Sequence, residues 1–175
     1  MCIIIDASAW SSVFKTTSKE HPEFSPVFDW VTVGKGKVVY GGTKYKRELA
    51  RATQYAKLFA ELGKAGRTAL VDDQKVDQEQ RILEETSLLQ DFDDPHLVAI
   101  VIVSHCKLIC SKDSTAYPFF QDKTLYPEGV ERPKIYSRYS NKSLLVDENI
   151  AAICKPCLKT PRRLQEGYLS ALPHS

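Results

Sequence analysis

Four consecutive apolar residues near the start of the chain, Cys2-Ile3-Ile4-Ile5, most constrain how it can fold. The run shows no polar alternation and is rich in β-branched residues, which predicts a strand buried on both faces. Strands of this kind lie in the middle of parallel sheets. The run ends at Asp6, and the ligand crevice of an open α/β sheet lies at the carboxyl ends of its strands. Asp6 is therefore predicted at the functional edge, with plain N-capping of the next helix as the alternative.

The rest of the chain alternates short apolar runs with helical patterns, which predicts an α/β fold. Further strands are expected at residues 37–40, 67–71, 107–110 and 134–137, and helices at 7–14, 24–33, 43–62, 74–89 and 94–103. Segment 94–103 also fits a buried strand, but Asp94 as N-cap and Pro95 at the first helical position favour a helix. The composition changes after residue 146. One domain is therefore predicted over residues 1–146, followed by a loosely ordered C-terminal extension at 147–175.

Composition argues against a membrane or secreted protein. No apolar run approaches the roughly 20 residues that span a bilayer, and the start lacks a basic region and a signal-like cleavage site. Cys2, Cys106 and Cys110 lie in apolar stretches and are predicted to be reduced thiols of the core. A cytoplasmic location is the resulting expectation. The net charge of +2 is too small to imply nucleic-acid binding by itself.

The extension carries one Cys-x-x-Cys pair, Cys154 and Cys157. A structural zinc site needs four ligands, and the further candidate in this segment is His174. A redox pair of the thioredoxin type would follow a strand within a βαβ unit, whereas this pair comes after the predicted domain. The two cysteines are therefore interpreted as incidental, with no zinc bound.

Four carboxylates are predicted to converge at the carboxyl edge of the sheet. Asp6 and Asp113 follow two buried strands, and Asp94 begins a helix. Glu48 lies at the edge of the apolar stripe of helix 43–62, where reaching solvent or pairing with Arg51 is the alternative. Clustered carboxylates repel, so at least one should have a raised pKa without a cation. Oxygen ligands suit Mg²⁺ or Mn²⁺, which can activate water for phosphoryl displacement.

The segments 2–8 (CIIIDAS), 94–99 (DPHLVA) and 108–113 (LICSKD) resemble, in their order and spacing, the PIN-domain nuclease family. The resemblance covers about residues 1–146. It implies a three-layer α/β/α fold with a central, mostly parallel sheet of Rossmann-like topology. It also implies metal-dependent cleavage of RNA, with the acids named above as metal ligands and catalytic residues. Members of the family include toxins of toxin–antitoxin pairs and RNA-processing nucleases.

The chain departs from the family pattern near its last acid. Lys112 stands between Ser111 and Asp113, where it can reach a phosphate or partly replace the cation. Asp91 and Asp93 offer alternative registers for the third acid, although the helix start favours Asp94. His96, in the first turn of the same helix, is interpreted as a structural histidine rather than a ligand.

The predicted function is therefore a Mg²⁺- or Mn²⁺-dependent endoribonuclease acting on single-stranded or structured RNA. Ser8, Ser111 and Lys112 are expected to position a water or a phosphate. Four basic residues are expected to contact the RNA backbone, with a solvated helix face as the alternative: Lys44, Lys46, Arg47 and Arg51. An antitoxin or another protein and a second copy of the chain are the other expected partners. The alternative function is a catalytically weak or inactive PIN-like module that binds RNA or a protein.

A phosphatase with Asp6 as nucleophile fits less well, because Ser8 stands where such enzymes carry a second Asp.

Overall fold

Five parallel strands form one sheet in the computed structural model, which describes residues 2–85 and 92–173. The strands are β1 (Cys2–Ile5), β2 (Lys37–Tyr40), β3 (Thr68–Leu70), β4 (Leu108–Cys110) and β5 (Lys134–Tyr136). Their order is β3-β2-β1-β4-β5, and every neighbouring pair is parallel. The predicted α/β class is confirmed, and the first strand occupies the centre of the sheet.

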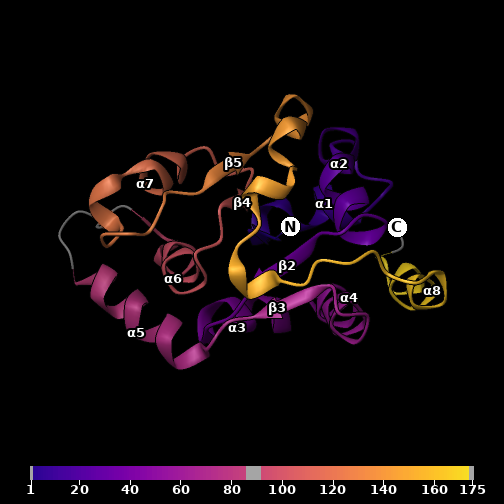
Figure 1. Cartoon of the computed structure of the whole chain (residues 1–175), viewed down its shortest axis with the longest axis horizontal. Helices are drawn as coiled ribbons and strands as arrows, with labels where there is room; N and C mark the ends of the chain where they lie inside the picture. The colour runs from indigo at the N-terminus through magenta and orange to yellow at the C-terminus, as the bar shows by residue number, and fades with distance from the viewer. Residues whose placement is uncertain (1, 86–91, 174–175) are drawn as a thin grey trace.

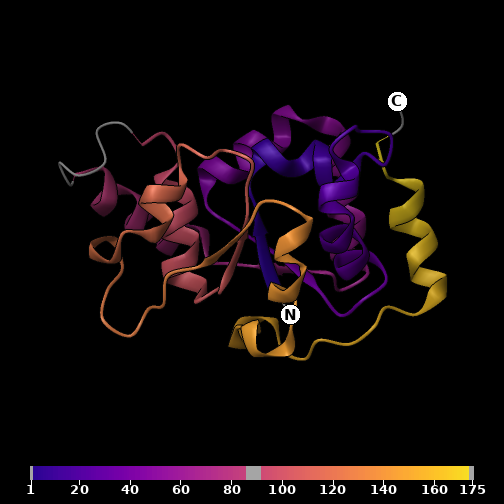
Figure 2. The same cartoon turned by 90° about the horizontal axis from the view of Figure 1, so that it is seen from above.

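Helices cover both faces of this sheet and complete three layers. The helices are α1 (Trp10–Phe14), α2 (His21–Thr32), α3 (Thr43–Arg51), α4 (Thr53–Lys64), α5 (Asp73–Glu84), α6 (Pro95–Ser104), α7 (Tyr117–Gln121) and α8 (Arg162–Ser170). Short 3₁₀ turns occur at Ala7–Ala9, Lys123–Leu125, Tyr139–Leu144, Asp147–Asn149 and Ala152–Cys154. Figure 1 shows α5, α6 and α7 on one side of the strands and α1, α2, α4 and α8 on the other, and Figure 2 gives the perpendicular view.

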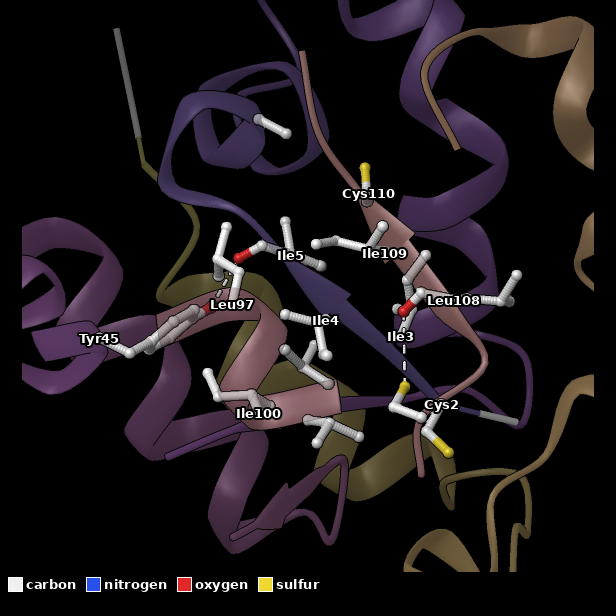
Figure 3. Close-up of a cluster of buried hydrophobic side chains, with 14 of the residues drawn as sticks. Cys2, Ile3, Ile4, Ile5, Tyr45, Leu97, Ile100, Leu108, Ile109 and Cys110 are labelled. Atoms are coloured by element: carbon white, nitrogen blue, oxygen red, sulfur yellow. Dashed lines mark hydrogen bonds between the residues drawn. The ribbon is translucent and has the colours of Figure 1, made fainter. Parts of the chain in front are cut away.

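The core is built around β1. Its four residues are completely buried, as the unbroken apolar run predicts. Figure 3 shows β1 beside Ile109 of β4, with Leu97 and Ile100 of α6 packed nearby. Burying a side chain of this size contributes about 1.5–3 kcal/mol. Helix α6 is apolar on nearly all sides and lies inside the protein, which confirms the helical interpretation of segment 94–103.

The long helix expected at 43–62 is two helices. Ala52 leaves the helical conformation, with φ −98° and ψ 69°, and separates α3 from α4. Its N–H still donates to the carbonyls of Glu48 and Leu49, so the last turn of α3 is satisfied. Neither Gly nor Pro marks the break, so the sequence pattern gave no reason to expect it. The predicted end of helix 74–89 lies outside the described residues.

Helix α3 is capped from outside by α5. Gly42 holds the N-cap position with a φ of 82°, and a Cβ there would approach Cγ1 of Val76 to 2.5 Å. The Gly42 N–H donates to Oδ1 of Asp73, and the Thr43 N–H donates to Oδ1 of Asp77, at 2.9 and 2.7 Å. These carboxylates satisfy donors that a helix start leaves open. The position of α3, and of Glu48 on it, therefore depends on α5.

The C-terminal extension is packed against the domain, so the expected loose ordering is wrong. Tyr168 of α8 is completely buried, and its hydroxyl donates to the carbonyl of Thr32. The buried guanidinium of Arg67 donates to the carbonyl of Leu158 at 2.7 Å. Helix α8 lies beside α4 (Figure 1). The domain boundary at residue 146 stays a prediction.

A disulfide joins Cys2 to Cys154, which corrects the expected reduced state of Cys2 and the incidental role of Cys154. Cys106 and Cys110 are buried thiols, as predicted. The disulfide occupies Cys154, and His174 lies outside the described residues. Disulfides are typical of oxidising compartments, so the cysteines no longer argue for a cytoplasmic location. Among the described helices, none is long and apolar enough to cross a membrane.

Candidate metal centre

The order in which the chain adds strands to the sheet reverses between β1 and β4. The candidate site lies at this switch point. Strands β1, β2 and β3 run to one edge in sequence order, whereas β4 and β5 run to the other. Ligands of open α/β sheets bind outside the carboxyl ends of the strands at such a switch point. Ile5 pairs with Cys110, and the Asp6 N–H donates to the Cys110 carbonyl at 2.9 Å. Asp6 and Ser111 are therefore neighbours at this edge.

Three hydrogen bonds hold the Asp6 carboxylate, which is 5% exposed. Its Oδ2 accepts from the hydroxyls of Ser8 and Ser111 at 2.5 and 2.6 Å, and its Oδ1 accepts from the Ser8 N–H at 3.2 Å. The last bond caps the 3₁₀ turn Ala7–Ala9, so the capping alternative is correct for one oxygen. The Lys112 N–H in turn donates to the Ser8 hydroxyl at 3.2 Å. The two serines orient Asp6 directly.

Helix α3 is fixed to the end of β1 by two aromatic side chains. The Tyr45 hydroxyl donates to the Ile5 carbonyl at 2.7 Å, and the Trp10 Nε1–H donates to the same oxygen at 3.0 Å. Tyr45 is completely buried and lies beside Ile5 in Figure 3. Glu48 follows Tyr45 by about one helical turn, so both side chains lie on the same face of α3. The anchoring of Tyr45 therefore brings Glu48 to the carboxyl edge of the sheet.

Glu48, Asp94 and His96 form a group that can hold a metal ion. Each offers one ligand atom, and these atoms lie within 4.8 Å of one another. Nε2 of His96 is 3.5 Å from Oε2 of Glu48, and Nδ1 is 3.7 Å from Oδ1 of Asp94. Asp94 stands at the N-cap position of α6, yet its side chain forms no capping hydrogen bond. That carboxylate faces His96 and Lys44 instead, with Nζ of Lys44 3.7 Å from Oδ1.

The two carboxyl groups of the group have opposite pKa shifts. Burial raises the pKa of Asp94, and the charges of Asp6 and Glu48 raise it further against the opposing effect of His96 and Lys44. Burial also acts to raise the pKa of Glu48, but the imidazole, Lys44 and Arg51 outweigh it, so that this pKa is lowered. The prediction that at least one clustered acid has a raised pKa is confirmed for Asp94. The charge of Asp6 contributes to the raised pKa of Asp94, so Asp6 lies close enough to interact electrostatically with Asp94.

His96 is the member of the group that the sequence interpretation missed. Its side chain is 2% exposed, and within the described parts of the chain neither ring nitrogen forms a hydrogen bond. The available signal was the contrast between one imidazole and the apolar residues of α6. That signal is weak, because buried histidines usually find a structural partner.

Asp113, the last predicted acid, does not face Glu48, Asp94 and His96. Oδ1 of Asp113 accepts from the N–H and the hydroxyl of Thr115 at 2.9 and 2.6 Å, which closes its own turn. Its N–H donates to the Ser111 hydroxyl at 3.1 Å, so Asp113 connects to Asp6 through one serine. Among the described residues, the 4.8 Å group extends neither to Asp6 nor to Asp113. The ammonium of Lys112 pairs with Glu20 rather than facing the acids.

The basic residues of α3 have different surroundings. Lys46 pairs with Asp73 of α5, so it serves the contact between two helices. Lys44 lies beside Asp94, and its ammonium also donates to the carbonyl of Asp93. Arg47 lines a shallow pocket between α3 and α5, and Arg51 is exposed. Of the two alternative acids, Asp93 is exposed and Asp91 lies outside the described residues.

No protein-family model matches the chain, and no curated protein or solved structure matches it either. The resemblance to PIN-domain nucleases therefore rests on the sequence segments alone. The fold and the site together define an α/β protein with a carboxylate–histidine group that can hold a metal ion at the switch point of its sheet.

Proposed function

We propose that this chain is a metal-dependent endoribonuclease of the PIN-domain type. The main support is the meeting of Glu48, Asp94 and His96 next to Asp6 at the carboxyl edge of a parallel sheet. Carboxylates brought together in this way repel unless a cation compensates them, and the ammonium of Lys44 lies 3.7 Å from Asp94 and also acts on Glu48. Burial is the main cause of the raised pKa of Asp94, and the charges of Asp6 and Glu48 add to it.

The residues fit a divalent cation, which would lower the pKa of a bound water and stabilise charge on phosphate oxygens. In this proposal Glu48 and Asp94 hold the ion. Asp6 orients the attacking water through Oδ1, which accepts only one hydrogen bond within the described chain. Ser8 and Ser111 act by fixing the Asp6 carboxylate, rather than by contacting phosphate themselves. Asp113 supports the same arrangement through Ser111.

RNA is the proposed substrate because the basic residues Lys44 and Arg47 lie on α3, the helix that carries Glu48. Both side chains line the shallow pocket between α3 and α5, at the start of α3. Basic side chains beside a hydrolytic centre can bind the phosphates of an RNA backbone that lies across it. A role as the toxin of a toxin–antitoxin pair, and assembly into a homodimer, remain predictions from the family resemblance.

A matched pair of substitutions tests the proposal. Asp94→Asn removes a proposed ligand, whereas Asp93→Asn makes the same chemical change on an exposed neighbour. We expect Asp94→Asn to lower cleavage of a labelled RNA by at least ~100-fold, or ~2.7 kcal/mol of barrier. We expect Asp93→Asn to keep the wild-type rate. Equal rates for Asp94→Asn and wild type, with Mn²⁺ and with Mg²⁺, would show that this centre does not cut RNA.

A non-catalytic module is the second candidate, and two contacts favour it. Lys112 is held by Glu20, and the Asp113 carboxylate is turned onto Thr115, so neither faces the other acids. RNA binding without cleavage in Mg²⁺, Mn²⁺ and Co²⁺ would select this function.

A further inference from the structure

His96 places a nitrogen ligand among carboxylate oxygens. Its imidazole is buried and faces oxygens of Glu48 and Asp94, at 3.5 and 3.7 Å. Within the described residues neither ring nitrogen has a hydrogen-bond partner. Leaving a buried polar group unsatisfied destabilises the folded state. Buried polar atoms without partners often mark the place of an ion or a water. Nε2 faces Glu48 and Nδ1 faces Asp94, and a cation coordinates only one of these nitrogens. One ring nitrogen and one oxygen from each carboxylate lie within 4.8 Å of one another, which favours a cation among the three.

The three side chains differ in exposure. The imidazole is 2% exposed, whereas the Glu48 and Asp94 side chains are each 25% exposed, so the group reaches solvent through its carboxylates. A cation bound at ~2.1 Å sets neighbouring ligand atoms roughly 3.0–3.4 Å apart. The three ligand atoms are within 4.8 Å in the ion-free protein. Rotation of the two partly exposed carboxylates closes the difference, while packing of α6 fixes the imidazole.

We propose that Glu48, Asp94 and His96 bind a first-row transition-metal dication of the Co²⁺, Fe²⁺ or Zn²⁺ type, and that the imidazole makes this site prefer such ions over Mg²⁺. Mg²⁺ takes oxygen ligands and keeps several waters, whereas imidazole suits zinc, iron and similar metals. The inference rests on the proposed function for the role of the ion, because Glu48 and Asp94 hold it there as well. It replaces the Mg²⁺ expected from oxygen ligands with an ion that also accepts nitrogen.

A protonated imidazole is the competing explanation. It would bridge the two carboxylates as a cation and leave no place for a metal. The two explanations differ in what His96→Gln does, because the amide offers an oxygen in place of the ring nitrogen. With a metal ligand lost, the preference for nitrogen-seeking ions disappears. With a bridging imidazolium lost, transition-metal binding stays as weak as before or rises.

Calorimetry of the metal-stripped full chain with Co²⁺ and with Mg²⁺ tests the inference. We expect one Co²⁺ per chain, bound at least ~10-fold more tightly than Mg²⁺. His96→Gln should weaken Co²⁺ binding at least ~10-fold and leave Mg²⁺ binding within about threefold. His105→Gln changes an exposed histidine in the same way and should alter neither affinity.

Several results would overturn the inference: no stoichiometric Co²⁺ binding, Mg²⁺ binding as tight as Co²⁺, an unchanged preference in His96→Gln, or an equal loss in His105→Gln. If His96→Gln fails to fold by circular dichroism, NMR of the wild type with ¹⁵N-labelled histidine decides. One equivalent of Co²⁺ must then broaden the His96 ring signals, and unchanged signals overturn the inference. A Co²⁺ preference without RNA cleavage contradicts the proposed function alone, whereas Mg²⁺-dependent cleavage without that preference contradicts this inference alone.

Discussion

Replacing Arg67 by Met should destabilise the protein strongly, because this guanidinium joins three separate segments. Arg67 is 2% exposed. It donates to the carbonyls of Val31 at 2.9 Å, of Leu158 at 2.7 Å, and of Gly34. These carbonyls belong to the end of α2, to the C-terminal extension and to the turn before β2. Burial lowers the pKa of the guanidinium, but an arginine stays charged at neutral pH.

The magnitude follows from those three bonds. Each hydrogen bond to a charged group contributes about 1.5–3 kcal/mol, and Arg67→Met leaves three carbonyls without their donor. Relief of the buried charge offsets part of that loss. We therefore expect the free energy of unfolding to fall by about 3 kcal/mol, or roughly 6–12 °C in melting temperature for a chain of this size.

Urea unfolding followed by circular dichroism measures the change. Arg163→Met is the matched control, because Arg163 is exposed on α8, and it should alter stability by less than ~0.5 kcal/mol. A loss below ~1 kcal/mol for Arg67→Met would refute the reasoning. It would mean that the extension does not depend on this guanidinium.

Three further outcomes are expected. Cys154→Ser should abolish the peptide linked to Cys2 in a non-reducing digest and lower stability by about 2–5 kcal/mol, and an unlinked wild type would contradict the pairing. In metal-free protein, the raised pKa of Asp94 favours its protonated form. Its stabilisation is therefore present below the ordinary carboxyl value of 3.8 and is lost as pH rises through the raised pKa. Asp94→Asn should flatten the plot of melting temperature against pH above pH 3.8, and a profile identical to that of the wild type would count against the shift. Arg47→Ala should weaken RNA binding and reduce the slope of log affinity against log salt by about one, whereas Lys57→Ala on α4 should change neither. An unchanged slope in both variants would mean that Arg47 does not contact RNA and belongs to a solvated helix face.

The strands could be predicted from sequence because an unbroken run of β-branched residues is stable in few structures other than a buried strand. Cys2–Ile5 needs cover on both faces, and only the centre of a parallel sheet supplies it. The meeting of Asp6 with the end of β4 then follows from strand polarity. Side-chain direction does not follow in the same way. Asp113 stands at the expected strand end, yet a local hydroxyl at Thr115 captures its carboxylate.

Features that depend on contacts between distant segments were beyond the sequence pattern. The break at Ala52 carries no Gly or Pro, and it separates α3, which contacts α5 and α6, from α4, which contacts α8 and β3. The approach of His96 to Glu48 needs the relative position of α3 and α6, which Tyr45 fixes through β1. The bond between Cys2 and a residue 152 positions later has no local signal at all.

The central position of β1 also has a consequence for synthesis on the ribosome. β1 is made first, but Ile4 pairs with Ile109, and the Asp6 carboxylate is oriented by Ser111. Contacts this distant along the chain form late, because the intervening segment must first be closed into a loop. A nascent chain that ends before β4 holds Asp6 without Ser111 or the second central strand. The Asp6 carboxylate therefore reaches its final orientation only after β4 and Ser111 have been made.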